Sequence, residues 1–500
     1  MGFFGYIVQI RFVAYAALGA VCGLFVGALP GLSVTMATAL LVSLTYTWKT
    51  EYALATVMGI YVIGVFSGAL SAILLNIPGA PSSVITTLDG YPMACRGRGE
   101  RAIRLAAVYS VMGSSVGLLA LWLLARPVTK LALLFTPMDT FLLCLFGLLS
   151  IGALTAEDAL KGWACSVFGL LLGMVGMDPV AGYPRLTFGI KALRTGIGTV
   201  PALIGLFGFA QVLAMTADAV SKKNESKKSA AAEDESAPAE DPNHTTGSLL
   251  RHWPVGLLAS LIGTGVGALP GAGSPIAALT AYGVAKRTVK RPTAPFGTGA
   301  EEGIAASEAA NNAVVGGALI PTLTLGVPGD AVTVILLSVF QIHGLQPGPL
   351  FLSHSQDAFM ALLAAGAVAT VCLVPLGLWI GPKMARVLRV PRAVMIPLVA
   401  ALCVAGAYWT ESRISDVVLM ILFGIAGYLL NRRGFPAAPI TLGLVLGSTM
   451  DANFRRAVSL ASSEDAPLAY LFGNPITLVL TAVIAVFLLR QGRKKRKKRT

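Results

Sequence analysis

Two kinds of residue in this sequence could take part in chemistry, and both kinds suit ions. Proline followed by glycine interrupts apolar segments at Pro30-Gly31, Pro78-Gly79, Pro270-Gly271 and Pro328-Gly329. Proline removes a backbone amide donor and glycine adopts conformations that other residues avoid, so these pairs predict breaks in helices. The N-terminus of a helix that restarts after a break presents free amides and a positive dipole, which favour an anion.

Hydroxyl and amide side chains stand next to these breaks. A substrate oxygen could bind them, or they could only cap the amides of the following helix. We expect an anion-binding site at the breaks, formed by Pro30, Gly31, Ser33, Thr35, Asn76, Pro78, Gly79, Pro270, Gly271, Gly273, Ser274, Pro328 and Gly329.

A second set of oxygen-bearing residues could bind a coupling cation. Neutral oxygens from amides, hydroxyls and unwound carbonyls suit sodium, and the candidates are Asn311, Asn312, Thr322 and Thr324. Glu308 is left open between ligand and cap, whereas Glu301 and Glu302 are expected to be solvated cap residues.

The stretch from Asn76 to Pro92 carries prolines, glycines and hydroxyls, which favours a loop along a wet cavity. Within it, Asp89-Gly90 is a common turn pair and is expected at the membrane surface.

The elements that must position these residues are apolar helices. The chain has 500 residues, of which 55% are hydrophobic and only 12% charged, so it cannot cover itself with polar side chains as a soluble protein does. Apolar runs recur at the length that crosses a bilayer, which predicts an all-α polytopic membrane protein of about ten to fourteen transmembrane helices, some broken or re-entrant.

Two matches indicate that the helices form two homologous halves. Gly23 to Gly31 recurs 240 positions later as Gly263 to Gly271, with the last six residues identical, and Leu75-Asn76-Ile77-Pro78-Gly79 recurs 250 positions later as Leu325-Gly326-Val327-Pro328-Gly329. We therefore expect membrane repeats at 1–220 and 251–489, joined by a polar disordered linker at 221–250 and followed by a basic tail at 490–500. The sequence leaves open whether the repeats are parallel or inverted.

Charge predicts the orientation in the membrane. The net charge is +14, and eight basic residues between Arg490 and Arg499 follow the last apolar run directly. Basic residues are retained in the cytoplasm, so the tail is expected there. Six cysteines and four histidines are scattered without metal-ligand spacing, and no nucleotide-binding motif is visible, so neither a metal nor another cofactor is expected.

Several ordered motifs resemble the large membrane subunit of the tripartite tricarboxylate transporters. They cover roughly residues 15 to 475 and comprise both Leu-Pro-Gly elements, Asn76–Gly79, Thr87–Pro92, Gly176–Pro179, Arg185–Gly189, Phe296–Gly303, Asn311–Ala313 and Gly344–Pro349. Ser33 departs from the pattern, where many relatives have glycine, and Asp451 stands where glutamate is more frequent.

The resemblance implies a bacterial inner-membrane permease that imports citrate or related carboxylates by symport with sodium or protons. It also implies two partners, a small four-helix membrane subunit and a periplasmic solute-binding protein. An anion channel could use the same breaks without ion coupling and is the principal alternative. A membrane-embedded enzyme would need a nucleophile and base or a metal cluster, for which the sequence offers no pattern.

Overall fold

The computed structural model describes residues 2–29, 32–155, 158–178, 182–225, 248–384 and 392–497. Pro30 and Gly31 of the first predicted break, residues 226–247 of the predicted linker and the last three residues of the basic tail lie outside this part of the chain.

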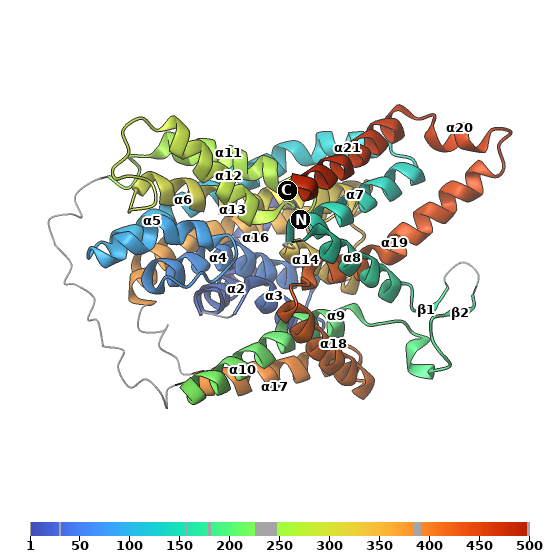
Figure 1. Cartoon of the computed structure of the whole chain (residues 1–500), viewed down its shortest axis with the longest axis horizontal. Coiled ribbons are helices and arrows are strands. Elements are labelled where there is room, and N and C mark those ends of the chain that lie inside the picture. The colour runs from blue at the N-terminus through green and yellow to red at the C-terminus, as the bar shows by residue number, and fades with distance from the viewer. Residues whose placement is uncertain are drawn as a thin grey trace.

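The described chain is almost entirely helical, with one short two-stranded sheet (Figure 1). The elements before residue 226 are α1 (Phe3–Ile7), α2 (Ile10–Ala28), α3 (Val34–Leu44), α4 (Thr50–Leu75), α5 (Ser83–Cys95), α6 (Gly99–Ala132), α7 (Pro137–Thr155), α8 (Ala159–Gly173), β1 (Gly176–Met177), β2 (Pro184–Arg185), η1 (Lys191–Leu193), α9 (Thr199–Leu203), the π-helix η2 (Ile204–Phe209) and α10 (Ala210–Glu225). Those after residue 247 are α11 (Trp253–Gly267), α12 (Gly273–Thr288), α13 (Glu301–Leu325), α14 (Ala331–Ile342), α15 (Phe351–His354), α16 (Gln356–Pro375), the π-helix η4 (Leu376–Ile380), α17 (Arg392–Glu411), α18 (Ile414–Arg432), α19 (Ala437–Ala461), α20 (Pro467–Phe472) and α21 (Pro475–Lys497).

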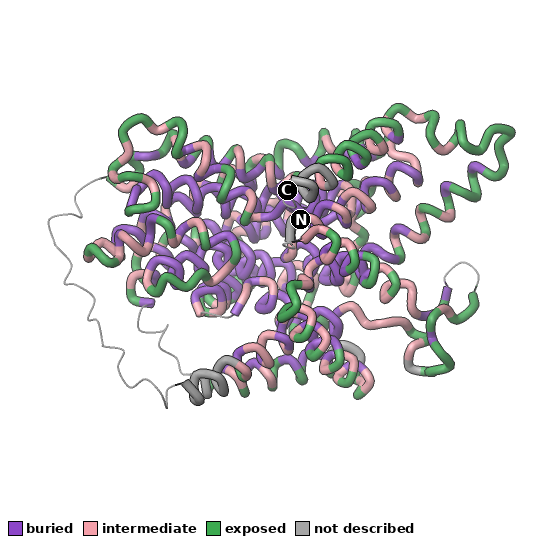
Figure 2. Tube along the Cα trace, in the orientation of Figure 1, coloured by how far each residue is buried: buried purple, intermediate pink, exposed green. Residues whose placement is uncertain are grey.

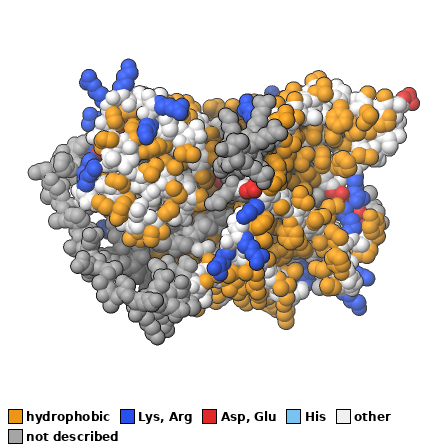
Figure 3. All heavy atoms as spheres, in the orientation of Figure 1, with side chains coloured by type: hydrophobic (Ala, Val, Ile, Leu, Met, Phe, Trp, Pro, Cys, Tyr) orange, Lys and Arg blue, Asp and Glu red, His pale blue; other side chains and the backbone are white. Residues whose placement is uncertain are grey.

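Within the described residues, six helices are long and apolar enough to cross a membrane. They are Ile10–Ala28, Thr50–Leu75, Gly99–Ala132, Thr199–Ala217, Gln356–Met384 and Ile414–Arg432, and six further apolar helices have 10–17 residues. Hydrophobic side chains cover broad areas of the surface (Figure 3), as a lipid-facing protein requires. The protein is therefore a polytopic membrane protein, as the composition predicted.

The core lies along α4 and α13 (Figure 2). Residues Ala53 to Ile73 of α4 and Glu301 to Thr324 of α13 are all buried. Small residues let neighbouring helices approach backbone to backbone, because a Cβ built on Gly113 of α6 would lie 2.2 Å from the carbonyl oxygen of Ala309. Such glycine contacts are the usual way in which helices pack closely in lipid.

Helices α2 and α3 form a helical hairpin that packs against the longer helix α4. Gly19, Gly23 and Gly27 of α2 pack on Thr56, Ile60 and Gly64 of α4 in the same order, so α2 and α4 run parallel. Between them α3 leads back, because Val34 at its start contacts Gly64, and Trp48 after its end packs on the Tyr15 ring near the start of α2. The end of α2 at Gly27 and the start of α3 at Val34 therefore both lie beside the middle of α4, and we call this end of the hairpin its tip.

Helices α11, α12 and α13 pack against one another in a similar way. Gly263 and Gly267 of α11 pack on Ala310 and Val314 of α13, so these two helices are also parallel. Helix α12 runs back between them, since its first residue Gly273 lies near Asp330 and its Tyr282 lies near Gly303 in the first turn of α13.

The chain after each long helix turns back to meet the hairpin tip. Asn76 ends α4 with φ 54° and Gly326 ends α13 with φ 72°, both left-handed conformations that asparagine and glycine adopt most readily. A Cβ on Gly79 would then lie 2.7 Å from the Gly27 oxygen, and one on Gly329 would lie 2.6 Å from the Gly267 oxygen. Glycine is required at both turns because backbone fills the space of a side chain.

The two arrangements run in opposite directions. Helix α5 continues in the direction of α4, because Ser83 contacts Gly68 and Gly90 contacts Ile73. Against α13 it runs the other way, since Thr86 meets Glu308 whereas Asp89 meets the earlier Ala300. Helix α4 is therefore antiparallel to α13, and α2 is antiparallel to α11.

Two predictions about local structure are wrong. The stretch from Asn76 to Pro92 was expected to be a loop, but only residues 76–82 are non-helical and the rest belongs to α5. Asp89 was expected in a surface turn, but it is fully buried inside α5.

Helix α10 ends at Glu225, so the first residues of the segment expected to be a linker are helical.

Candidate functional site

A cavity of about 470 Å³ lies where the two hairpin tips and the two turns converge. Its wall contains Ser33, Val34 and Thr35 at the start of α3, Ala80, Pro81 and Ser82 before α5, Gly271 to Ile276 at the start of α12, and Asp330 to Val332 at the start of α14. Further wall residues come from α4, α7, η2 and the α18–α19 junction, namely Val65, Ile151, Phe207, Asn431 and Pro436 to Ala438. Four helix N-termini thus line one cavity.

The first-turn amides of a helix have no partner within that helix, and the helix dipole makes its N-terminus positive. Side chains occupy two of the four N-termini. Ser33 Oγ accepts from the Met36 amide at 3.1 Å, and Asp330 Oδ1 accepts from the Thr333 amide at 2.8 Å. The N-termini of α5 and α12, one before and one after the predicted linker, have no side-chain cap.

One carboxylate stands on the cavity wall. Asp330 is 8% exposed, and its Oδ2 accepts from the Tyr61 hydroxyl of α4 at 2.5 Å while Oδ1 also accepts from Thr333 Oγ1 at 2.9 Å. Both oxygens are therefore turned toward donors of the protein. This carboxylate ties the start of α14 to the middle of α4.

The structure brings together part of the expected anion site. Ser33, Thr35, Gly271, Gly273 and Ser274 line the cavity. The other described candidates do not line it: Asn76, Pro78, Gly79, Pro270, Pro328 and Gly329 form the turns behind it. In these turns the Gly271 amide donates to the Gly329 oxygen at 3.1 Å, which joins the α11–α12 tip to the turn before α14.

Sequence reasoning missed Ser82 and Asp330 among the wall residues. Each follows a Pro-Gly pair within a few positions, and serine and aspartate are favoured residues at helix N-termini, so the signal was present. Asn431 and Pro436 gave no such signal, because they come from a distant helix junction.

The expected cation ligands separate into two groups. Asn311 and Asn312 lie in the middle of α13 and donate from Nδ2 to backbone oxygens of α4, at 3.3 Å to Val65 and 3.0 Å to Val62. Thr322 and Thr324, three turns further on, donate to carbonyls of their own helix, Ala318 and Ile320. Glu308 joins the asparagines, since its carboxylate accepts from Thr86 Oγ1 and from Ser110 Oγ.

The expectation that Glu301 and Glu302 are solvated is wrong. Each is 3% exposed. Glu301 pairs with Arg98 and with Arg101, whose Nε and Nη2 lie 2.7 and 2.9 Å from its two oxygens. Glu302 accepts from Thr293 Oγ1 at 2.8 Å. Both residues do begin a helix, but tertiary partners have replaced water.

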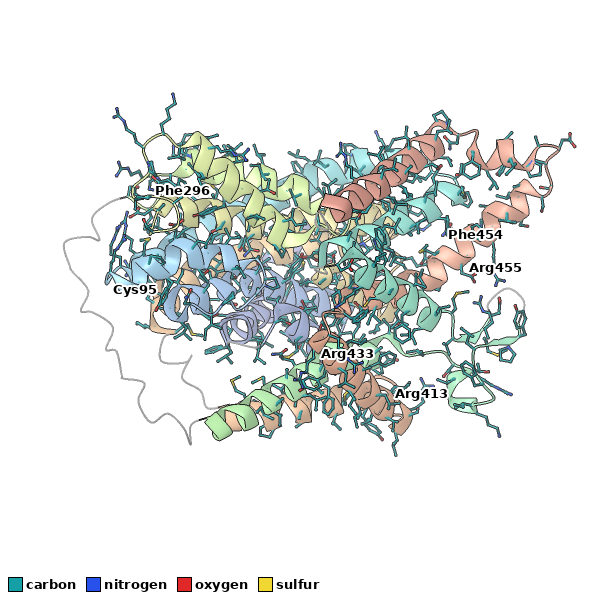
Figure 4. The ribbon with its side chains drawn as sticks, in the orientation of Figure 1. Cys95, Phe296, Arg413, Arg433, Phe454 and Arg455 are labelled. Atoms are coloured by element: carbon teal, nitrogen blue, oxygen red, sulfur yellow. The ribbon has the colours of Figure 1, made fainter. Side chains whose placement is uncertain are left out.

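A nest of amides surrounds the buried Asp89. Its Oδ1 accepts from the amides of Gly297, Gly299 and Ala300, each at 2.8 Å, and its Oδ2 accepts from the Tyr282 hydroxyl at 2.9 Å. Figure 4 shows Cys95, at the end of α5, and Phe296, in the segment before α13, toward one end of the molecule, with Phe454 and Arg455 toward the other. The Asp-Gly-Tyr-Pro motif thus holds the segment before α13 to α5.

A second cavity, of about 670 Å³, lies at the far end of α14. Its wall is polar and includes Gln341, Gln346, His354, Asn453 and Arg456. Helices α14 and α19 line both cavities, with Val332 and Ala437 at the first and Leu337 and Val445 at the second.

Apolar helices of membrane-spanning length, interrupted so that several helix ends line one cavity, are typical of a polytopic membrane transport protein. Comparison of the sequence gives the family: residues 13–442 match the tripartite tricarboxylate transporter TctA family, and the chain belongs to it. This is a transporter family, not an enzyme family, and its members are the large membrane subunits of tripartite systems that include two partner proteins.

Two relatives from Agrobacterium vitis are similar to the chain. The first, described as an uncharacterized 52.8 kDa protein in the TAR-I ttuC' 3' region, is 33% identical over 491 residues, which are 97% of this chain and 95% of the relative. The second, an uncharacterized protein in the TAR-II ttuC' 3' region, is 34% identical over 202 residues, which are 40% of this chain and 83% of the relative. No solved structure matches the chain.

Proposed function

We propose that this chain is the permease subunit of a binding-protein-dependent secondary transporter that imports tricarboxylates or related carboxylates. The observation that carries the proposal is the convergence of four helix N-termini on one cavity, two of them without a side-chain cap. Amide-rich, positive helix ends suit a substrate with several carboxylates. The cavity of about 470 Å³ also has room for a small organic anion.

We further propose that the two hairpin arrangements are inverted homologous repeats. The sequence matches at offsets of 240 and 250 positions, the equivalent packing of Gly27 with Gly79 and of Gly267 with Gly329, and the opposite directions of α2 and α11 support this. Inverted repeats give a transporter two related conformations that open to opposite sides of the membrane. The shorter apolar helices then complete the membrane domain around the six long ones.

Import of an anion into a negative interior requires a driving ion. Moving one negative charge inward against 100 mV costs about 2.3 kcal/mol, so a trianion costs about 7 kcal/mol. Coupling to sodium or protons offsets this when the cations outnumber the substrate charges. Asn311 and Asn312 remain coupling-ion candidates, whereas Thr322 and Thr324 lie about three turns further along α13 and bond to carbonyls there.

The proposed setting is the bacterial inner membrane, with the basic tail in the cytoplasm. A small four-helix membrane subunit is the proposed membrane partner, and a periplasmic solute-binding protein delivers the substrate. The family supports the two partners, and the tendency of basic residues to stay on the cytoplasmic side supports the orientation of the tail.

Uptake into proteoliposomes tests the proposal against the channel alternative. The chain is reconstituted with its membrane partner, the binding protein and labelled citrate are added outside, and an inward sodium or proton gradient is imposed. We expect accumulation above the external concentration that collapses when the gradient is dissipated. Uptake that stops at equal concentrations would favour a channel, and no uptake of any di- or tricarboxylate would refute the assignment.

A further inference from the structure

A polar cluster is buried at the meeting point of α4, α5, α6 and α13. At its centre, the fully buried Glu308 carboxylate accepts from Thr86 Oγ1 of α5 and from Ser110 Oγ of α6 at 3.4 Å. Thr86 Oγ1 also lies 3.3 Å from Ser307 Oγ. Hydroxyls from two neighbouring helices thus contact one acidic side chain in the interior of the protein.

The cluster contains a carboxylate without a basic partner. None of the ion pairs among the described residues includes Glu308, in contrast to Glu301 at the start of the same helix, which pairs with Arg98 and Arg101. A buried carboxylate that no positive charge neutralises costs several kcal/mol. A cation bound at this point would remove that cost.

Two amide oxygens of the cluster also lack a partner. Asn311 Oδ1 and Asn312 Oδ1 are buried and accept no hydrogen bond. Their identity as oxygens is secure, because the other atom of each amide donates to a backbone carbonyl of α4, which can only accept. Residues 308, 311 and 312 are three and four positions apart, so their side chains share one face of α13.

We propose that Glu308, Asn311 and Asn312 bind the sodium ion that drives transport, with Thr86 and Ser110 as further oxygen ligands. This inference rests on the proposed function and adds the charged residue of the cation site. Sodium is favoured over a proton because a protonated Glu308 could donate to one acceptor only, whereas a metal ion accepts several oxygens at once. Thr322 and Thr324 are not part of this site.

The site is positioned to couple the cation to the substrate. Val65 of α4 accepts from Asn311 and also lines the cavity, and Tyr61, one turn earlier, donates to Asp330 on the cavity wall. A single turn of α4 therefore separates the cation cluster from the proposed anion site. A sodium ion that draws in Glu308 and the two asparagines acts directly on this turn.

Sodium binding by the purified full-length chain tests the inference without substrate. The apparent melting temperature in detergent is measured in sodium chloride and in choline chloride of equal ionic strength. A ligand that binds only the folded state raises stability, so the wild type should melt at a higher temperature in sodium. Glu308→Gln keeps the shape and hydrogen-bonding capacity of the side chain but removes its charge, and it should lose the sodium-dependent shift. Glu464→Gln, at an exposed position after α19, is the matched control and should retain the shift.

Uptake by the reconstituted transporter gives the second measurement. In Glu308→Gln the sodium dependence of carboxylate uptake should disappear, and Asn311→Ala should raise the sodium concentration for half-maximal uptake at least tenfold. A wild-type melting temperature that is equal in both salts, or a sodium shift that survives in Glu308→Gln, would overturn the inference. Uptake driven by protons and indifferent to sodium would overturn it as well. A sodium shift lost in Glu308→Gln while no carboxylate is transported would support the cation site and count against the proposed substrate alone.

Discussion

The proposed anion site can be tested by placing a negative charge inside it. Ser274, the second residue of α12, lines the cavity at a helix N-terminus that no side chain caps. In Ser274→Asp the new carboxylate would take the place of a substrate carboxylate. Folding should not suffer, because a negative charge in the first turn of a helix stabilises it by about 0.3 to 1 kcal/mol.

The size of the cavity sets the magnitude of the effect. A sphere with the volume of this cavity, about 470 Å³, has a diameter of about 10 Å, and we take this length as the separation of two charges inside it. At an effective dielectric constant of about 20, two like charges about 10 Å apart repel by about 1.7 kcal/mol. That repulsion corresponds to about a fifteenfold loss of affinity for each negative charge of the substrate, and for a trianion the sum is about 5 kcal/mol.

The assay is concentration-dependent uptake into proteoliposomes, with the amount of folded transporter measured by size-exclusion chromatography. Ser274→Asn is the matched control, since asparagine is similar in size and also a good N-terminal residue but carries no charge. We expect Ser274→Asn to transport and Ser274→Asp to require a far higher substrate concentration, or to show no uptake. Equal half-saturation concentrations for the two variants would refute the anion site at α12.

Three further predictions concern the scaffold. Gly329→Ala should prevent accumulation of folded protein, because its Cβ would lie 2.6 Å from a backbone oxygen, whereas Gly265→Ala, with nothing within 4 Å, should express normally. Glu301→Gln should lower stability by about 3 to 5 kcal/mol in thermal unfolding, because it leaves the buried Arg101 guanidinium without its carboxylate partner. In a cysteine-free background, we expect Tyr46→Cys, just after the end of α3, and Thr288→Cys, at the end of α12, to react with membrane-impermeant reagents from opposite sides of the membrane.

Each of these results has a clear counter-result. Normal yields of Gly329→Ala would mean that the turn before α14 has room that the structure does not show. An unchanged melting temperature for Glu301→Gln would mean that water replaces the lost carboxylate charge. Labelling of both cysteines from one side would contradict the inverted arrangement of the two hairpins.

Helix positions followed closely from the sequence because the bilayer imposes length and composition together. The sequence is apolar over nearly the whole length of α4 (Thr50–Leu75) and of α2 (Ile10–Ala28), which have the length and composition to cross a membrane. The breaks were also predictable, since proline and glycine act on their own backbone. Three Pro-Gly pairs, at 78–79, 270–271 and 328–329, mark turns next to the cavity, and the pair at 30–31 lies outside the described residues.

The wrong predictions share one cause, which is tertiary contact between distant segments. Asp89 was assigned to a surface turn on local grounds, but three amides from residues 297–300 hold it inside the protein. Glu301 was assigned to water, but Arg98 and Arg101, some 200 positions away, neutralise it. Glu308 could not be decided for the same reason, because its hydroxyl neighbours come from two other helices.

The contact between α6 and α13 restricts how this transporter can move. A Cβ on Gly316 would lie 2.0 Å from the backbone of Gly117, and one on Gly113 would lie 2.2 Å from that of Ala309, so the two backbones touch with no side chains between them. Helix α6 precedes the predicted linker and α13 follows it, so this contact joins the first half of the chain to the second. We therefore expect the two halves not to separate at this contact during transport. Opening toward either side of the membrane would then come from sliding or bending of other elements relative to α6 and α13, and the hairpin tips at the cavity are not held by this contact.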